Sequence, residues 1–205
     1  TSLASRYCHD EFTRQYYPTA GVDFLLKRMS LSGAGNITLK LWDVGGQSLS
    51  GNMLDKYVFG ADIVILVYDI TNIPSFESLE EWLNTVRKIV SSQEPQPMVA
   101  VQINDGDLEH QRKVRPEKQH KFIQENGLSS YLVSARTGEM VALCFQKIVA
   151  EVLGLKLTRA EQEQQPVMQA EILHTPASTT VPDGHSSTSN NFAPPGSKSA
   201  ICVIQ

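Results

Sequence analysis

The segment at 42–47 carries residue types that could act on a phosphate group. It reads Trp-Asp-Val-Gly-Gly-Gln at the end of an apolar, β-rich run. Asp43 could hold Mg²⁺ through water, the N–H of Gly46 could approach a terminal phosphate, and Gln47 could orient an attacking water molecule. A strand that ends in a tight glycine turn would have the same composition. Taken alone, the segment is compatible with either phosphoryl-transfer chemistry or a plain glycine turn.

A second polar segment, Asn104 to Asp107, could recognise a purine base. Its amide and carboxylate have the spacing that can read a guanine edge. The carboxylate would accept from both N1–H and N2–H₂ of guanine, whereas adenine offers the opposite pattern. Taken alone, an Asn/Asp/Gly turn is the simpler explanation.

Two further loops give weaker signals. Backbone amides in Ser134-Ala135-Arg136 could meet the guanine oxygen, and the hydroxyl of Thr19 could complete a Mg²⁺ shell from a loop at 17–21. The combination matters because ligands of open α/β sheets bind where loops follow strands.

The elements that must position these loops alternate along the chain. Two β-rich runs flank Ser32-Gly33-Ala34-Gly35, which predicts a hairpin. Further on, apolar β-runs alternate with helical patterns, which predicts a parallel, doubly wound α/β sheet with an antiparallel hairpin at one edge. The expected helices are 1–12, 75–91, 116–126 and 138–153, and the expected strands are 22–31, 36–44, 61–69, 98–103 and 131–134.

The bulk properties exclude several classes of protein. The 205 residues carry a net charge of −4, which gives no reason to expect nucleic-acid binding. No apolar run approaches the roughly 20 residues that span a bilayer, and no secretory leader begins the sequence. Cys8 and Cys144 are expected to be small core residues in a reducing cytosol, because the cysteines have no disulfide or zinc spacing.

The last fifty residues, 156–205, differ from the rest and predict a flexible tail after a domain at 1–155. Residues 175–199 are rich in Ser, Thr, Pro, Asn and Gly, so burial cannot offset their ordering entropy. The chain then ends in Cys202-Val203-Ile204-Gln205, which fits a C-a-a-X prenylation box of the type usually farnesylated. A chance cysteine before two aliphatic residues is the alternative.

Order and spacing of these segments resemble the small GTPases over nearly all of 1–153. Trp42 to Gln47 also matches Arf proteins, but the remaining segments and the terminus do not. The chain is similar to Rab-type GTPases, and to a divergent branch of them that ends in a single-cysteine box. The Rab-like segments are 20–24 (Ala-Gly-Val-Asp-Phe), 39–43 (Leu-Lys-Leu-Trp-Asp), 66–71 (Leu-Val-Tyr-Asp-Ile-Thr) and 81–83 (Glu-Trp-Leu).

The resemblance implies a GTP- and GDP-binding site with Mg²⁺ on a P-loop-NTPase-type sheet. Thr1 resembles the last residue of the phosphate loop, and Thr1, Thr19 and Asp43 would be the Mg²⁺ residues. Gln47 would be the catalytic residue that positions water. The nucleotide would contact Phe12, Tyr16, Thr19, Gly46, Asn104, Asp107, Ser134, Ala135 and Arg136, the last in place of the usual lysine.

The same resemblance implies a trafficking switch on the cytoplasmic face of membranes. Effectors, an exchange factor and a GTPase-activating protein would bind through Tyr16–Phe24 and Asp43–Tyr57. A prenyltransferase would modify Cys202, and a prenyl-binding solubilising factor would return the protein to the cytosol. A single lipid with only Lys198 nearby binds membranes reversibly.

Two departures from the family favour a different reading of the chain. The sequence starts at Thr1, so the first strand and most of the phosphate loop are missing, which predicts unpaired inner sheet edges and weak GTP binding. Asp105 replaces the family's lysine, and its charge would lower affinity for a polyanion. A prenylated, non-catalytic interaction module that binds no nucleotide is therefore the alternative function. A flavodoxin-like binder would fit the alternation of elements but not the four polar loops.

Overall fold

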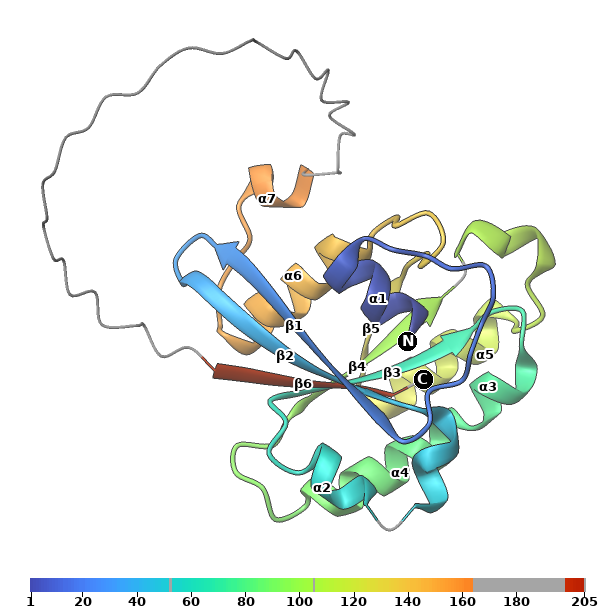
Figure 1. Cartoon of the computed structure of the whole chain (residues 1–205). Coiled ribbons are helices and arrows are strands. Elements are labelled where there is room, and N and C mark those ends of the chain that lie inside the picture. Colours follow the sequence, from blue (N-terminus) through green and yellow to red (C-terminus); the bar gives the residue numbers. More distant parts are fainter. Residues whose placement is uncertain (52, 105, 164–197, 205) are drawn as a thin grey trace, which may run out of the picture. The chain divides into compact units, whose positions relative to one another are not determined.

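The computed structural model describes residues 1–51, 53–104, 106–163 and 198–204. Its centre is a sheet with strand order β1-β2-β6-β3-β4-β5 (Figure 1). β1 and β2 pair antiparallel, and every other pairing is parallel. This confirms the predicted α/β sheet with an antiparallel hairpin at one edge. The strands are β1 Val22–Leu31, β2 Gly35–Val44, β3 Ile63–Asp69, β4 Met98–Asn104, β5 Ser129–Leu132 and β6 Lys198–Ile204.

Helices cover both faces of the sheet. One core joins α1 and α6 to the sheet, and the other joins α2 and α4 to the opposite face. None of the helices in the described ranges is long and apolar enough to cross a membrane. The helices are α1 Ser2–His9, α2 Leu54–Val58, α3 Ile73–Glu77, α4 Leu79–Val90, α5 Pro116–Asn126, α6 Val141–Val152 and α7 Arg159–Glu163, with 3₁₀ segments η1 Gly46–Ser50 and η2 Gly106–Gln111.

Backbone conformation moves several predicted ends. α1 stops at His9 because Asp10 takes a left-handed φ of 58°. α6 begins three residues later than predicted, since Gly138 and Met140 have φ of 81° and 59° and cannot join a right-handed helix. β5 ends before the predicted Ser134, whose N–H donates to the carbonyl of Glu139 instead of continuing the ladder.

The helix predicted at 75–91 is two helices. α3 starts earlier, where Asn72 caps it by accepting from the N–H of Ser75 at 3.4 Å and Pro74 lies in its first turn. The break follows at Ser78, whose hydroxyl donates to the carbonyl of Ser75 at 3.0 Å. Such side-chain bonds to the backbone compete with a continuous helix.

β6 is the strand that the sequence analysis did not find. Its backbone pairs with β2 from Thr38–Lys198 to Val44–Ile204, and with β3 from Ile63–Ile201 to Leu66–Ile204. The prediction that β2 and β3 present unpaired inner edges is therefore wrong in the described structure (Figure 1). The predicted tail, at 156–205, also contains this strand and α7, while its residues 164–197 lie outside the described ranges.

Candidate functional site

Three of the predicted Mg²⁺ residues come together at the start of α1. The hydroxyls of Thr1 and Thr19 are in hydrogen-bond contact. The Thr19 hydroxyl also donates to Asp43 Oδ2 at 3.1 Å. The Asp43 side chain is fully buried. Hydroxyl and carboxylate oxygens are hard ligands of the kind that Mg²⁺ prefers, so the donor set fits the ion.

The loop that carries Thr19 is fixed against the turn after β2. Gly45 donates its N–H to the carbonyl of Gly21 at 2.9 Å, and the Ser48 hydroxyl donates to the same oxygen at 3.0 Å. A Cβ at Gly45 would overlap the carbonyl oxygen of Thr19. Gly45 is therefore required for the close approach of the two loops, a role that the sequence analysis did not assign to it.

Several residues predicted to contact the nucleotide or to position water lie at the surface. Gly46 and Gln47 begin η1 and are exposed. Tyr16 is 63% exposed, so its side chain does not close over a site in this conformation. Phe12, predicted to contact the nucleotide, is partly buried against the core that α1 and α6 share.

The predicted base-recognition residues form one cluster at the ends of β4 and β5. Ser134 donates from its hydroxyl to Asp107 Oδ1 at 2.5 Å. The N–H of Ala135 donates to Asn104 Oδ1 at 3.2 Å. Arg136 is more loosely placed, with Nη1 3.7 Å from Asp107 Oδ2 and a side chain that is 57% exposed. The structure thus brings together four residues from two distant segments, as predicted.

The loop of Ser134 is built by local hydrogen bonds. The N–H of Thr137 donates to the Ser134 hydroxyl at 3.1 Å, and the N–H of Ser134 donates to the carbonyl of Glu139 at 3.1 Å. Ser134 is 1% exposed, so these bonds satisfy polar groups that burial would otherwise leave unpaired. The Asp107 carboxylate consequently has a fixed position from which it could accept from a base.

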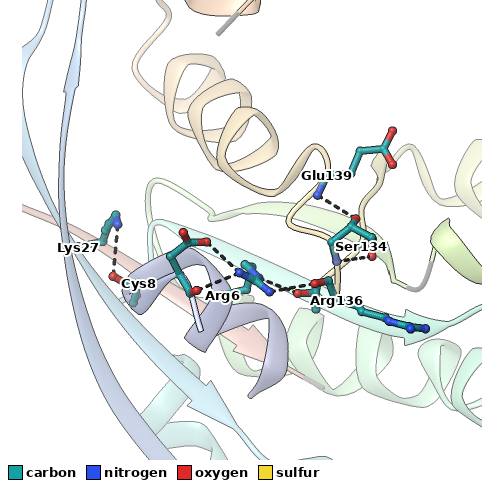
Figure 2. A network of polar contacts seen from close by, with 9 residues as sticks. Arg6, Cys8, Lys27, Ser134, Arg136 and Glu139 are labelled. Atoms are coloured by element: carbon teal, nitrogen blue, oxygen red, sulfur yellow. Dashed lines mark hydrogen bonds and ion pairs between the residues drawn. The ribbon is translucent and has the colours of Figure 1, made fainter. Parts of the chain in front are cut away.

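Helix α1 links the two clusters. Thr1 lies in the metal cluster, and Arg6 donates to the carbonyl of Ala135 in the base cluster at 2.8 Å. Five residues of helix advance by about 7.5 Å along the axis. Figure 2 shows Arg6 reaching from α1 toward Arg136 in the loop that also carries Ser134 and Glu139. The sequence analysis missed Arg6, because a partly apolar helix gives no sign of which distant carbonyls its arginine will meet.

A cavity of about 380 Å³ adjoins the base loop between β5 and α6. Its lining includes Ser134, Lys147 and the buried Cys144. Burial raises the pKa of the Cys144 thiol to about 12, so the thiol is protonated and unreactive at neutral pH. This agrees with the prediction that Cys144 is a core residue; Cys8 is only partly buried.

Asp105, where the family has a lysine, lies outside the described residues. Cys202 belongs to β6, where its backbone is opposite Trp42 on one side and Val64 on the other.

Within the described ranges no three His, Cys, Asp or Glu side chains gather as a metal site, so a Mg²⁺ ion would depend on the threonine hydroxyls beside Asp43.

Comparison with known proteins gives a consistent result. The Ras family profile matches residues 1–154. Rab-28 of Caenorhabditis elegans is 40% identical over 177 residues, which cover 86% of this chain and 71% of that relative. Rab-13 of Bos taurus is 31% identical over 153 residues, covering 75% of this chain and 73% of that relative, and Rab-13 of Canis lupus familiaris aligns equally well. The chain therefore belongs to the Rab branch of the Ras family of small GTPases.

Proposed function

We propose that the protein is a switch that binds GTP or GDP with Mg²⁺ and hydrolyses GTP in membrane trafficking. The observation that carries this proposal is the link between the two clusters through α1. Thr1, Thr19 and Asp43 meet at one end of the helix, and Arg6 contacts the Ser134–Arg136 loop about one and a half turns further on. This arrangement suits a ligand with a magnesium-bound phosphate group at one end and a base at the other.

Each cluster has a defined task in this proposal. Bound Mg²⁺ would neutralise charge that develops on the phosphates, with Thr1, Thr19 and Asp43 as its protein neighbours. Asp107 would accept from N1–H and N2–H₂ of guanine, while the N–H of Ala135 would donate to its O6. Gln47, exposed in η1, would orient the attacking water once the loops around it close.

The partner surface of the proposed switch has an aromatic face. The rings of Phe24 and Trp42 meet edge-on with their centroids 4.9 Å apart, and the ring centroids of Trp42 and Tyr57 are 6.2 Å apart. Phe24 is 60% exposed and Leu26 is 65% exposed. Exposed aromatic groups of this kind are typical of protein interfaces. Effectors and regulators would bind here, across the segments Tyr16–Phe24 and Asp43–Tyr57.

Cys202 would carry a prenyl group that anchors the protein reversibly to the cytoplasmic face of membranes. The support for this part is the sequence of the C-terminal box. A prenyltransferase would attach the lipid, and a solubilising partner would extract it from the bilayer.

A non-catalytic interaction module is the second candidate function. The aromatic contacts of Phe24, Trp42 and Tyr57 involve none of the residues proposed to bind the nucleotide. A partner that binds this face alone would need neither GTP nor hydrolysis.

Base specificity tests the first proposal most directly. Asp107→Asn replaces an acceptor by an amide that can donate, and xanthine has a carbonyl where guanine has its amino group. We expect the wild type to prefer GDP over XDP by about 10²-fold or more, and Asp107→Asn to reverse that order, since an unpaired buried polar group costs about 1–3 kcal/mol. Fluorescent-nucleotide titration with Mg²⁺ measures both affinities.

Glu80→Gln is the matched control, because Glu80 is exposed on α4 and also changes from carboxylate to amide. It should leave the preference for GDP unchanged. A wild-type chain that binds GDP no better than ADP would overturn the nucleotide switch. If that chain still captured a partner through Phe24 and Trp42, and lost it on Phe24→Ala, the interaction module would stand.

A further inference from the structure

Arg6 makes a set of hydrogen bonds to which the proposed mechanism assigns no role. Its Nε donates to the carbonyl of Ala135 at 2.8 Å, and its Nη2 donates to the carbonyl of Arg136 at 2.9 Å. Its Nη1 donates to the carbonyl of Asp10 at 2.9 Å. The side chain is only 16% exposed. One guanidinium therefore joins the end of α1 to two successive peptide groups of a loop about 130 positions away.

The two loop carbonyls determine how the Ala135 region is oriented. The carbonyls of Ala135 and Arg136 belong to consecutive peptide planes, and the flat guanidinium fork holds both at once. Ala135 itself is fully buried, and its N–H points to Asn104 Oδ1 at 3.2 Å. With its carbonyl fixed on one side, the residue directs its N–H to Asn104 on the other. In the proposed complex the O6 of guanine would replace Asn104 Oδ1 as the acceptor of this N–H.

The surroundings of Arg6 favour this geometry. Gly138 has a φ of 81°, and a Cβ there would lie 3.6 Å from Arg6 Cδ, so the loop folds closely around the arginine stem. Asp10 has a left-handed φ that turns its carbonyl toward Nη1. Arg6 also pairs with Asp10 Oδ1 at 2.9 Å, but that carboxylate is 89% exposed and the ion pair adds little stability. The carbonyl bonds are therefore the main constraint.

We propose that Arg6 is a positioning residue for base recognition: it holds the Ser134–Arg136 loop so that the Ala135 N–H meets the O6 of guanine. This inference rests on the proposed binding of guanine nucleotides. A lysine in its place has a single point of charge and cannot hold two carbonyls in a fixed plane, whereas a glutamine can donate to only one of them.

Hydrogen exchange tests the loop-holding step without nucleotide. In the full chain, peptides that cover 133–140 should exchange about tenfold faster or more in Arg6→Gln than in the wild type, with Arg6→Lys in between. Arg28→Gln is the matched control, because Arg28 is exposed on β1. Equal exchange rates in the wild type and Arg6→Gln would overturn the inference.

Base analogues test the recognition step. A 2-aminopurine ribonucleoside diphosphate lacks O6 and N1–H but keeps the amino group that Asp107 would read, and IDP keeps O6 and N1–H but lacks that amino group. The missing N1–H affects the wild type and Arg6→Gln alike, so a change in preference between them reports on O6. Arg6→Gln should lower the preference for GDP over the 2-aminopurine analogue by about tenfold. The preference for GDP over IDP should change less.

The outcomes separate this inference from the proposed function. A general loss of stability would weaken all three ligands equally and would overturn the positioning role. If the wild type bound no guanine nucleotide, the proposed function would fail and the positioning role would fail with it. In that case faster exchange in Arg6→Gln would still establish Arg6 as the residue that holds the loop.

Discussion

At the residue scale, the site depends on a few atoms whose surroundings fix their position. Asp43 is fully buried beside two threonine hydroxyls, and Asp107 accepts from a serine that is itself buried. Gln47 differs, because it is exposed and begins a 3₁₀ segment. The proposed binding groups are thus preorganised, while the proposed catalytic group would have to be brought into place by loop closure.

Gln47→Leu separates binding from hydrolysis. Leucine cannot accept from or donate to water, so single-turnover GTP hydrolysis should slow by roughly 10–100-fold. Affinity for GDP should stay the same, because Gln47 belongs to neither the metal cluster nor the base cluster. Gln111→Leu, at an exposed glutamine in η2, should leave both quantities unchanged. Unchanged hydrolysis in Gln47→Leu would remove the residue from the mechanism.

At the element scale, α1 and α6 pack against each other through aromatic rings. Tyr7 and Phe145 stack with ring centroids 3.9 Å apart and an interplanar angle of 8°. Both residues are buried, and burial together with this contact fixes the helix that carries Thr1 and Arg6. The geometry of the proposed site therefore depends on a packing contact behind it.

Phe145→Ala should destabilise the fold strongly. It removes a fully buried ring and leaves a cavity, so the free energy of unfolding should fall by about 3–5 kcal/mol. Urea unfolding monitored by circular dichroism measures the change. Phe59→Ala, at a phenylalanine that is 57% exposed, provides the comparison and should cost much less. A loss below ~1 kcal/mol for Phe145→Ala would contradict the packing described.

The segment after α6 is attached to the hairpin by one carboxylate. Glu161 Oε1 accepts from the N–H of Ser32 at 2.8 Å, and Oε2 accepts from the N–H and hydroxyl of Thr158 at 2.8 Å. The Ser32 N–H, followed by the Thr158 groups, lowers the pKa of Glu161 to about 2. The ionised form is therefore the one that holds the hairpin.

This attachment should depend on pH in a specific direction. Since the pKa is lowered from 4.5 to about 2, the tether should be complete above pH 4.5 and should weaken as the pH falls toward 2. Exchange of the Ser32 amide, followed by NMR across that range, should accelerate at low pH beyond its intrinsic rate. In Glu161→Ala, which removes the acceptor, the amide should already exchange fast at pH 7, whereas Glu117→Ala on α5 should behave as wild type. A pH-independent protection of Ser32 would contradict the tether.

Sequence reasoning succeeded where local chemistry decides the structure. The turn at 32–35 joins the two strands of the predicted hairpin, and α5 has the predicted bounds Pro116–Asn126. It also grouped Asn104, Asp107, Ser134 and Ala135. It failed where distant segments meet, because neither the carbonyl partners of Arg6 nor the neighbours of β6 are encoded in a local pattern.

At the scale of the whole molecule, β6 completes the sheet. It pairs with β2 and β3, which do not pair directly with each other in the described sheet. Its signal was present in the sequence, as the β-branched and apolar run Ala200 to Ile204. Such a run is typical of a central parallel strand. Because its cysteine also matches a lipidation box, the local sequence pattern fits both a buried strand and a lipidation site and does not distinguish them.

Removal of residues 198–205 should expose both edges that β6 covers. The shortened chain should melt at a lower temperature and scatter more light, because unpaired apolar strand edges promote aggregation. In the full chain, amides of 198–204 should exchange about as slowly as those of β4. Cys202→Ser is the control, since the backbone makes the ladder and should still pair. Fast exchange at 198–204 together with an unchanged melting temperature would contradict a structural role for β6.

The position of β6 would tie the proposed membrane attachment to folding. A transferase that modified Cys202 would need this segment unpaired, and a strand paired on both sides is not accessible to it. The rate of lipidation should then scale with the small fraction of molecules whose last strand is detached. Conversely, a molecule whose lipidated Cys202 was held at a bilayer surface would lack the strand between β2 and β3. A substitution that strengthens the ladder around β6 would thus reduce lipid attachment without altering Cys202 or the enzyme that modifies it.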